Sequence, residues 1–406
     1  MTNAGDTAWV LVASALVLMM TPALAFFYGG MVRRKNVLST LSLSFVVMAL
    51  IGVQWVVVGY TLAFGKDIGG LIGGLTFLGM RGVGAAPDPT YAASIPLAAF
   101  AVFQMMFAII TPALITGALV ERVNLGGFVV FVLLWTTVVY DPVAHWVWGD
   151  GGLLRSMGAL DFAGGTVVHI LAGFSALAVA RVIGKRRGFP VAPFEPHNIP
   201  YTVLGAGLLW VGWFGFNGGS ALAANGLAVH ALVTTNTAAA AATLAWMGLN
   251  WALGERFGTL GLVTGAIVGL VAITPAAGYV TPMAALVIGA LAAPVSYGAI
   301  RLRRRWGLDE SLDVWGCHGM AGTWGAVATG LFASRAVNPA GADGLLYGNP
   351  HLLLVQAVAV VISIAYAFGM TYVIVKLLGV GMRIRVSDVE EEVGLDLSIH
   401  GERAYA

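Results

Sequence analysis

Two short stretches of the sequence place a carboxylate and a histidine in strongly apolar surroundings. One reads Asp-Phe-Ala-Gly-Gly-Thr-Val-Val-His from Asp161 to His169, and the other reads Asp-Val-Trp-Gly-Cys-His from Asp313 to His318. An imidazole can donate a hydrogen bond through one ring nitrogen, accept one through the other, and exchange protons near neutral pH. Ionisable groups at membrane depth are costly and usually mark a transport route. The two histidines therefore predict a polar contact inside an apolar tube.

Each of these residues also has a purely structural explanation. A histidine can tie two helices together by bonding a backbone carbonyl, although the occurrence of two related histidines favours transport. Asp161 begins a predicted helix, so its carboxylate can cap the free N–H groups of the first turn. A capped carboxylate still lowers the electrostatic energy of a nearby cation. For Asp313 we expect the capping role alone.

The composition is that of an integral membrane protein. The chain of 406 residues is 59% hydrophobic and 10% charged, against roughly 25% charged residues in soluble domains. The single cysteine, Cys317, excludes an intrachain disulfide and a cysteine-based metal site. The sequence contains neither a nucleotide-binding motif nor metal-ligand spacing, so we predict no metal, no cofactor and no catalytic residues, and an enzyme is the class that we favour least.

Hydropathy predicts an all-α fold with eleven transmembrane helices, each close to the roughly 20 apolar residues that a bilayer requires. The apolar runs are continuous rather than alternating, which indicates helices and not a barrel. The transmembrane domain is expected to cover residues 1–380, and the acidic segment 381–406 to form a cytoplasmic tail with no core of its own. The predicted spans are 8–30, 39–64, 95–120, 125–147, 162–183, 200–222, 229–252, 258–275, 280–301, 314–333 and 351–378.

The basic residues predict the orientation of these spans. With the N-terminus outside, 17 of the 21 lysines and arginines fall on inner connections or on the tail, and the other four are Lys66, Arg81, Arg155 and Arg335. This bias places the N-terminus outside and the C-terminus inside the cytoplasmic membrane. Because membrane topology explains the basic loops, they do not indicate a nucleic-acid partner.

Short matches five spans apart indicate an inverted repeat of five plus five helices, followed by one final helix. The segment Phe26-Phe-Tyr-Gly-Gly30 matches Phe216-Asn-Gly-Gly-Ser220, Thr111-Pro112 matches Thr274-Pro275, and the two Asp/His stretches match each other. An odd offset reverses the direction through the membrane, and such repeats hold their functional site near the midplane.

Aromatic residues gather near the outer ends of three predicted spans. Phe103 and Phe107 lie one turn apart, Trp148 ends the fourth span, and Phe216 and Ser220 lie near the outer end of the sixth. A ring face attracts a small cation by about 0.5–2 kcal/mol. Taken singly, each of these residues is better explained by structure than by cation binding, tryptophan by an interfacial aromatic belt and phenylalanine by core packing.

Several of these motifs, in this order, closely resemble those of the Amt/Mep/Rh ammonium transporter family, and of its bacterial and archaeal Amt branch in particular. They span nearly the whole chain: Phe27-Tyr-Gly-Gly-Met-Val-Arg-Arg-Lys-Asn36, Asp161 to His169, Gly212-Trp-Phe-Gly-Phe-Asn-Gly-Gly-Ser220, Asp313-Val-Trp-Gly-Cys-His-Gly319 and His400-Gly-Glu-Arg-Ala-Tyr405. The resemblance implies a homotrimer with a narrow pore through each subunit.

The resemblance also implies roles for nine residues. They form an outer ammonium-binding site (Phe107, Trp148, Ser220), a gate of two stacked rings (Phe107, Phe216), a pore lining (His169, His318, Trp213), an aspartate below the vestibule (Asp161) and a vestibule position (Phe103). A further implied partner is a PII-type signalling protein on the cytoplasmic face. The stretch from Trp148 to Asp161 is about one residue longer here than in some relatives, which bears on the placement of Trp148.

The predicted function is therefore ammonium transport. Ammonium and potassium have similar size and equal charge, but only ammonium can give up a proton and cross a dry pore as neutral ammonia. Two other functions are also compatible with the sequence. One is a neutral-gas channel of the Rh kind that passes ammonia or carbon dioxide, and the other is an ammonium sensor or receptor with little transport.

Overall fold

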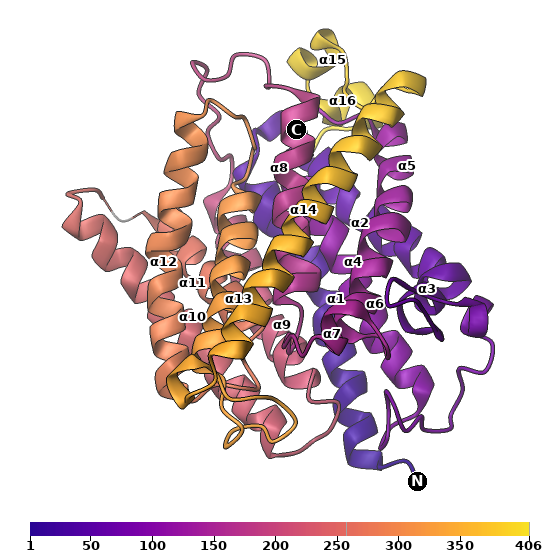
Figure 1. Cartoon of the computed structure of the whole chain (residues 1–406). Coiled ribbons are helices and arrows are strands. Elements are labelled where there is room, and N and C mark those ends of the chain that lie inside the picture. Colours follow the sequence, from indigo (N-terminus) through magenta and orange to yellow (C-terminus); the bar gives the residue numbers. More distant parts are fainter. Residues whose placement is uncertain (257, 406) are drawn as a thin grey trace.

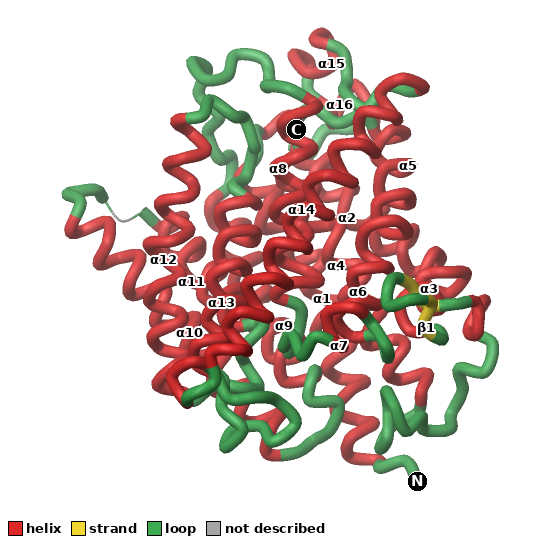
Figure 2. Tube along the Cα trace, in the orientation of Figure 1, coloured by secondary structure: helices red, strands yellow, loops and turns green. Residues whose placement is uncertain are grey.

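The computed structural model of the chain describes residues 1–256 and 258–405. Its helices pack side by side along one common direction, with the N-terminus at one end and the short C-terminal helices α15 (Asp388–Val393) and α16 (Leu395–His400) at the other (Figure 1). We call these ends the N-terminal face and the tail face. Most loops lie at these two ends, as expected if the helices cross a membrane (Figure 2).

The first half of the chain ends with the helix that follows His169. Its elements are α1 (Ala4–Met31), η1 (Arg34–Asn36), α2 (Val37–Gln54), η2 (Trp55–Gly59), α3 (Tyr60–Phe64), β1 (Asp67–Ile68), β2 (Ile72–Gly73), η3 (Leu75–Met80), α4 (Leu97–Leu119), α5 (Leu125–Trp135), η4 (Thr136–Tyr140), α6 (Asp141–Trp148), α7 (Leu153–Ser156), η5 (Gly165–Ile170) and α8 (Leu171–Ile183). The two strands form a small antiparallel hairpin.

The second half repeats the pattern of long apolar helices. Its elements are α9 (Ile199–Gly219), α10 (Gly226–Ala252), α11 (Thr259–Ile273), α12 (Pro282–Arg305), η6 (Trp315–Met320), α13 (Ala321–Phe332), η7 (Leu345–Tyr347), α14 (Pro350–Gly381), α15 (Asp388–Val393) and α16 (Leu395–His400).

In the part of the chain that the structure describes, 9 helices are long and apolar enough to cross a membrane. They account for nine of the predicted spans. The two remaining predicted spans, 258–275 and 314–333, correspond to the 15-residue helix α11 and to η6 followed by α13.

Four π-helical segments interrupt the described helices: η2, η4, η5 and η6. Such segments are rare in proteins overall, but those that occur often lie at functional sites. Two of them, η5 and η6, carry His169 and His318, and each lies where its helix begins. Gly164, with φ of 114°, turns the backbone into η5 in a left-handed conformation that favours glycine.

Glycine allows the two histidine-bearing helices to touch. A Cβ placed on Gly173 in α8 would lie 2.1 Å from the backbone nitrogen of Gly319 in η6. Only a residue without a side chain permits this approach, which brings the two backbones into direct contact.

The tail folds back onto the tail face. Leu395 is buried, Asp396 accepts a hydrogen bond from the Ser39 backbone at 2.8 Å, and Glu391 accepts one from the Arg187 backbone at 2.6 Å. These contacts join the tail to α2 and to the segment after α8, so its short helices are packed against the helix bundle.

Candidate functional site

Three cavities follow one another through the helices from the N-terminal face to the tail face. The first, of about 180 Å³, is lined by Phe107; the second, of about 10 Å³, by Phe216, His169 and His318; and the third, of about 410 Å³, by His318 again. The two phenylalanine rings separate the first cavity from the second, and His318 borders both the second and the third.

The cavity at the N-terminal face brings together four residues singled out in the sequence: Phe103, Phe107, Trp148 and Ser220. The Ser220 hydroxyl donates to the Phe216 carbonyl at 2.8 Å. Its oxygen therefore retains lone pairs that can accept a hydrogen bond from a guest. Aromatic faces next to such an acceptor form an environment that suits a small cation with N–H donors.

Phe107 and Phe216 form the barrier beneath this cavity. Their ring centroids lie 4.4 Å apart at an interplanar angle of 46°, so the rings are tilted rather than parallel. Both are buried, with exposed fractions of 1% and 0%. A guest passing from the first cavity to the second must displace these rings.

Asp161 caps the segment that carries His169, as the sequence predicts. Its Oδ1 accepts hydrogen bonds from Gly164 and Gly165, each at 2.8 Å, and its Oδ2 accepts from Thr166 at 2.8 Å and Val167 at 3.2 Å. The Asp161 carbonyl in turn accepts from the Trp148 indole at 3.0 Å. One residue thus fixes both the start of η5 and a wall of the first cavity.

The two histidines meet, which confirms the central geometric prediction. Their Nδ1 atoms lie 3.3 Å apart, and the rings are buried, with exposed fractions of 1% and 4%. A bond between two Nδ1 atoms requires one ring to donate and the other to accept, so the pair shares one proton. The cavity beside them is about the size of one water molecule.

Aromatic rings and an apolar wall hold His169 in place. Its ring stacks on Trp213 at 5.4 Å and on Phe216 at 5.8 Å between centroids. The Trp213 indole donates to the Thr274 hydroxyl at 2.9 Å, which fixes the orientation of that ring. The second cavity is otherwise lined by aliphatic side chains, by Phe27 and by His318.

The prediction that Asp313 caps the second histidine segment is wrong. Glu310 performs this role, accepting hydrogen bonds from the backbones of Val314 at 2.9 Å and Trp315 at 3.2 Å. Asp313, with φ of 58°, instead accepts from the Arg303 guanidinium at 2.7 Å. Glu310 precedes His318 by the same eight residues that separate Asp161 from His169, so Glu310 is the counterpart of Asp161. Burial raises the pKa of Glu310 to about 7.

The cavity at the tail face is wider and more polar than the other two. Its lining includes Tyr28, Arg304 and Asp313 next to His318. Glu255, at its rim, accepts from the Tyr297 hydroxyl at 2.7 Å. Charged and polar side chains around this wider cavity can form hydrogen bonds with water and with a guest that leaves the apolar second cavity.

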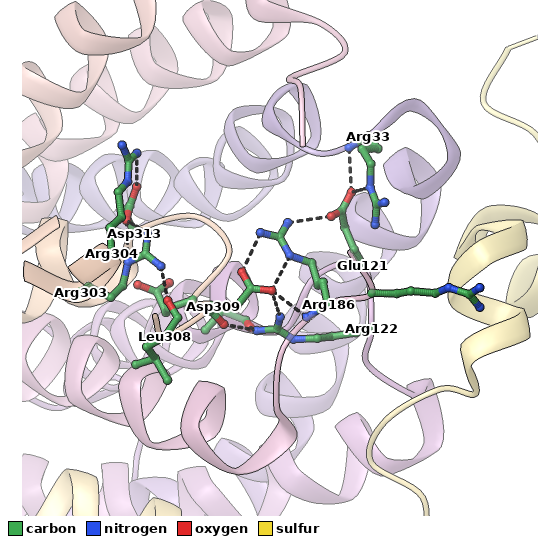
Figure 3. A network of polar contacts seen from close by, with 12 residues as sticks. Arg33, Glu121, Arg122, Arg186, Arg303, Arg304, Leu308, Asp309 and Asp313 are labelled. Carbon is green, nitrogen blue, oxygen red and sulfur yellow. Dashed lines mark hydrogen bonds and ion pairs between the residues drawn. The ribbon is translucent and has the colours of Figure 1, made fainter. Parts of the chain in front are cut away.

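A buried network of ion pairs lies at the tail face (Figure 3). Arg186 lies between Glu121 and Asp309, with contacts of 2.7 Å and 2.8 Å, and Arg122 pairs with Asp309 at 2.7 Å. Burial opposes ionisation of Asp309, but Arg186 and Arg122 outweigh it and lower its pKa to about 2. The network joins the segments that follow α4, α8 and α12, and so fixes the ends of these helices.

Three buried or cavity-lining polar residues were missed by reasoning from the sequence. Gln104 lines the first cavity, Glu310 caps η6, and Asp141 is buried within the helices with an exposed fraction of 0%. Asp141 could have been found, because it is a carboxylate inside the predicted span 125–147. Among the described residues, no group of three or more histidine, cysteine and acidic residues could hold a metal ion.

Comparisons with known proteins agree over the whole chain. The model of the Ammonium Transporter Family matches residues 8–405. The chain is 49% identical over 402 residues to an ammonium transporter of Bacillus subtilis, covering 99% of this chain and 98% of that protein. It is 50% identical over 401 residues to ammonium transporter Amt1 of Archaeoglobus fulgidus, covering 99% of each.

Solved structures show the same architecture. Mep2 of Saccharomyces cerevisiae superposes with a TM-score of 0.89 at 36% identity, covering 95% of this chain and 91% of that chain. A protein described as a sensor Amt protein superposes with a TM-score of 0.90 at 28% identity, covering 97% of this chain and 98% of that chain.

Proposed function

The chain belongs to the ammonium transporter family, and we propose that it recruits ammonium at the N-terminal face, removes one proton, and conducts ammonia past the histidine pair. The observation that carries this mechanism is the contact of 3.3 Å between His169 and His318 beside a cavity of about 10 Å³.

Recruitment rests on the first cavity. A cation there meets the rings of Phe107 and Trp148 and can donate an N–H to the Ser220 hydroxyl, and Phe103 lines the same cavity. Potassium would also be attracted to the ring faces, because it carries the same charge. This cavity therefore concentrates small cations without choosing strongly between them.

Selection follows from the second cavity. Moving a bare ion into an apolar space costs far more than a few hydrogen bonds return. Ammonium avoids this cost by leaving its proton behind, whereas potassium has no proton to lose. Asp161 is buried next to Trp148 of the first cavity, and its negative charge attracts the proton that ammonium releases.

The histidine pair then serves the neutral guest and the proton. Ammonia offers both N–H donors and a lone pair, which match the free acceptor and donor sites of two imidazoles that share a proton. Nε2 of His169 has no hydrogen-bond partner and offers one such site. The stacked Trp213 ring fixes the orientation of the His169 ring. The same pair can pass the separated proton toward the tail face.

The membrane arrangement follows from the same reasoning. We propose eleven transmembrane helices in two inverted halves of five plus a final helix, counting α11 and the combined segment η6–α13 as spans. The distribution of lysine and arginine supports an outer N-terminal face and a cytoplasmic tail face, residues 381–406 included, in the cytoplasmic membrane. Family membership supports a homotrimer and a PII-type protein as partner at the tail face.

The decisive experiment compares ammonium and potassium on one preparation of proteoliposomes by solid-supported membrane electrophysiology. We expect a current on addition of ammonium and none on addition of potassium. Equal currents for the two ions would contradict selection by deprotonation. Ammonia flux with no ammonium current would favour a neutral-gas channel of the Rh kind.

A second candidate function is favoured by the similarity to the sensor Amt protein. In that case ammonium binding would be the output and transport would be slight. Uptake of radiolabelled methylammonium into the same proteoliposomes separates the two, because a sensor would bind the analogue without accumulating it inside the vesicles.

A further inference from the structure

A second polar site lies away from the histidine pair, where the two remaining π-helical segments meet. Gln54 directly precedes η2, and Asp141 directly follows η4. The Gln54 amide donates to Asp141 Oδ2 at 2.7 Å and to the Thr137 hydroxyl at 3.2 Å. The backbone irregularity that marks each histidine thus also marks this carboxylate.

Several polar atoms around Asp141 have no protein partner. Among the described residues, Oδ1 of Asp141, Oε1 of Gln54 and Oγ1 of Thr136 are buried without a hydrogen bond, and the buried Tyr140 hydroxyl lies beside the Thr111 side chain. Each of these residues has an exposed fraction of 6% or less. A buried polar group without a partner is unfavourable, and such groups are the usual setting of internal water and of functional chemistry.

The Asp141 carboxyl group also has no basic partner among the described residues. In the described part of the chain, no lysine, arginine or histidine forms an ion pair with it. His145, one turn further along α6, directs its ring nitrogens to the Ala63 carbonyl and to Asp67, each at 2.9 Å. An ionised carboxylate without a counter-ion at this depth would be strongly unfavourable.

We propose that Asp141 is a second proton-binding site of the membrane interior, protonated in the resting protein and hydrated together with Gln54 and Thr136. As a neutral acid it keeps Oδ2 as the acceptor for Gln54 and gains an O–H donor at Oδ1. This assignment rests on the local geometry alone and does not depend on how ammonium crosses the pore.

Tyr140 provides the route by which this proton exchanges. Its hydroxyl lies close enough to both Asp141 and Asp161 to interact with the charge of either. A tyrosine hydroxyl relays a proton by accepting one at its oxygen while donating its own, so no charge accumulates on the ring. A path from Asp141 through Tyr140 to Asp161 would then be completed by water that hydrogen-bonds the Tyr140 hydroxyl to each carboxylate.

Infrared spectroscopy of the purified full-length protein in lipid, without ammonium, tests the site. We expect the wild type to show the C=O stretch of protonated carboxyls at neutral pH, with Glu310 contributing, Asp141→Asn to lose one component of that band, and Asp141→Glu to shift that component. Asp388→Asn, at an exposed carboxylate, is the matched control and should leave the band unchanged. A band identical in the wild type and in Asp141→Asn would overturn the proposal, and Asp141→Glu decides the question if the asparagine variant does not fold.

Exchange into heavy water tests the route. The component that Asp141→Asn lacks should shift on deuteration, and Tyr140→Phe should slow that shift by roughly tenfold or more, as expected when an acid–base relay is removed. An unchanged exchange rate in Tyr140→Phe would exclude Tyr140 as the relay. Because these measurements need no transport, their failure would leave the ammonium current of the wild type as a separate result.

Discussion

Removal of the Arg186 side chain should destabilise the protein more than any neighbouring change on the tail face. Its guanidinium contacts Asp309 through Nε at 3.0 Å and Nη2 at 2.8 Å, and Glu121 through Nη1 at 2.7 Å. The side chain is 7% exposed, and those of its partners are 0% and 1% exposed. In Arg186→Met both carboxylates would lose their shared cation.

The magnitude follows from what remains. Breaking a buried ion pair by removing one partner costs about 3–5 kcal/mol. Arg122 still pairs with Asp309, and Arg33 still pairs with Glu121. These remaining contacts place the expected loss near the lower end, at about 3 kcal/mol.

The adjacent arginine provides a matched control. Arg187 pairs with Glu392 at 2.9 Å, but the two side chains are 54% and 64% exposed, so Arg187→Met should cost less than about 1 kcal/mol. Steric trapping in lipid–detergent bicelles at neutral pH measures both free energies of unfolding. Equal losses in the two variants would refute the view that the network is a principal stabilising element of this face.

Three further predictions concern the binding cavity, the ionic network and the helix contact. Trp148→Leu should raise the half-saturating ammonium concentration of the transport current roughly 2- to 30-fold, because a cation–π contact contributes about 0.5–2 kcal/mol; an unchanged value would remove Trp148 from the binding site. The pKa of Asp309 is lowered from 3.8 to about 2, so ionised Asp309 contributes about 2 kcal/mol to folding above pH 4, and this contribution is lost as the pH falls toward 2. The free energy of unfolding of the wild type should therefore fall across this pH range more than that of Asp309→Asn. The same fall in both proteins would contradict the assignment. Gly173→Ala should lower the melting temperature measured by intrinsic fluorescence, because the new Cβ would lie 2.1 Å from the Gly319 nitrogen. At Gly207 nothing lies within 4 Å, so Gly207→Ala should be neutral or mildly stabilising. Similar shifts for both variants would contradict the close helix contact.

The sequence predicted much of the pore because its residues lie in continuous, ordered motifs. Hydropathy located the long spans, and the position of Asp161 at a helix start predicted its capping bonds. The spacing of the two histidines within their segments led to the expectation that the rings meet, and the structure places their Nδ1 atoms 3.3 Å apart.

Other features could not be found from residue types alone. Asp313 is nearer to His318 in sequence, but its left-handed backbone and the adjacent Arg303 turn it away, so that Glu310 caps η6. The ionic network joins residues more than 60 positions apart, such as Glu121 and Arg186. The π-helical segments depend on tertiary packing and leave no simple pattern in the sequence.

The measurement that tests the central claim most directly is the ammonium current of a variant in which His169 and His318 are both replaced by leucine, compared with the wild type in matched proteoliposomes. We predict that the ammonium-specific current disappears, because the dry segment would then lack any group that shares or passes a proton. An undiminished, potassium-excluding ammonium current in the double variant would show that selection does not depend on the histidine pair.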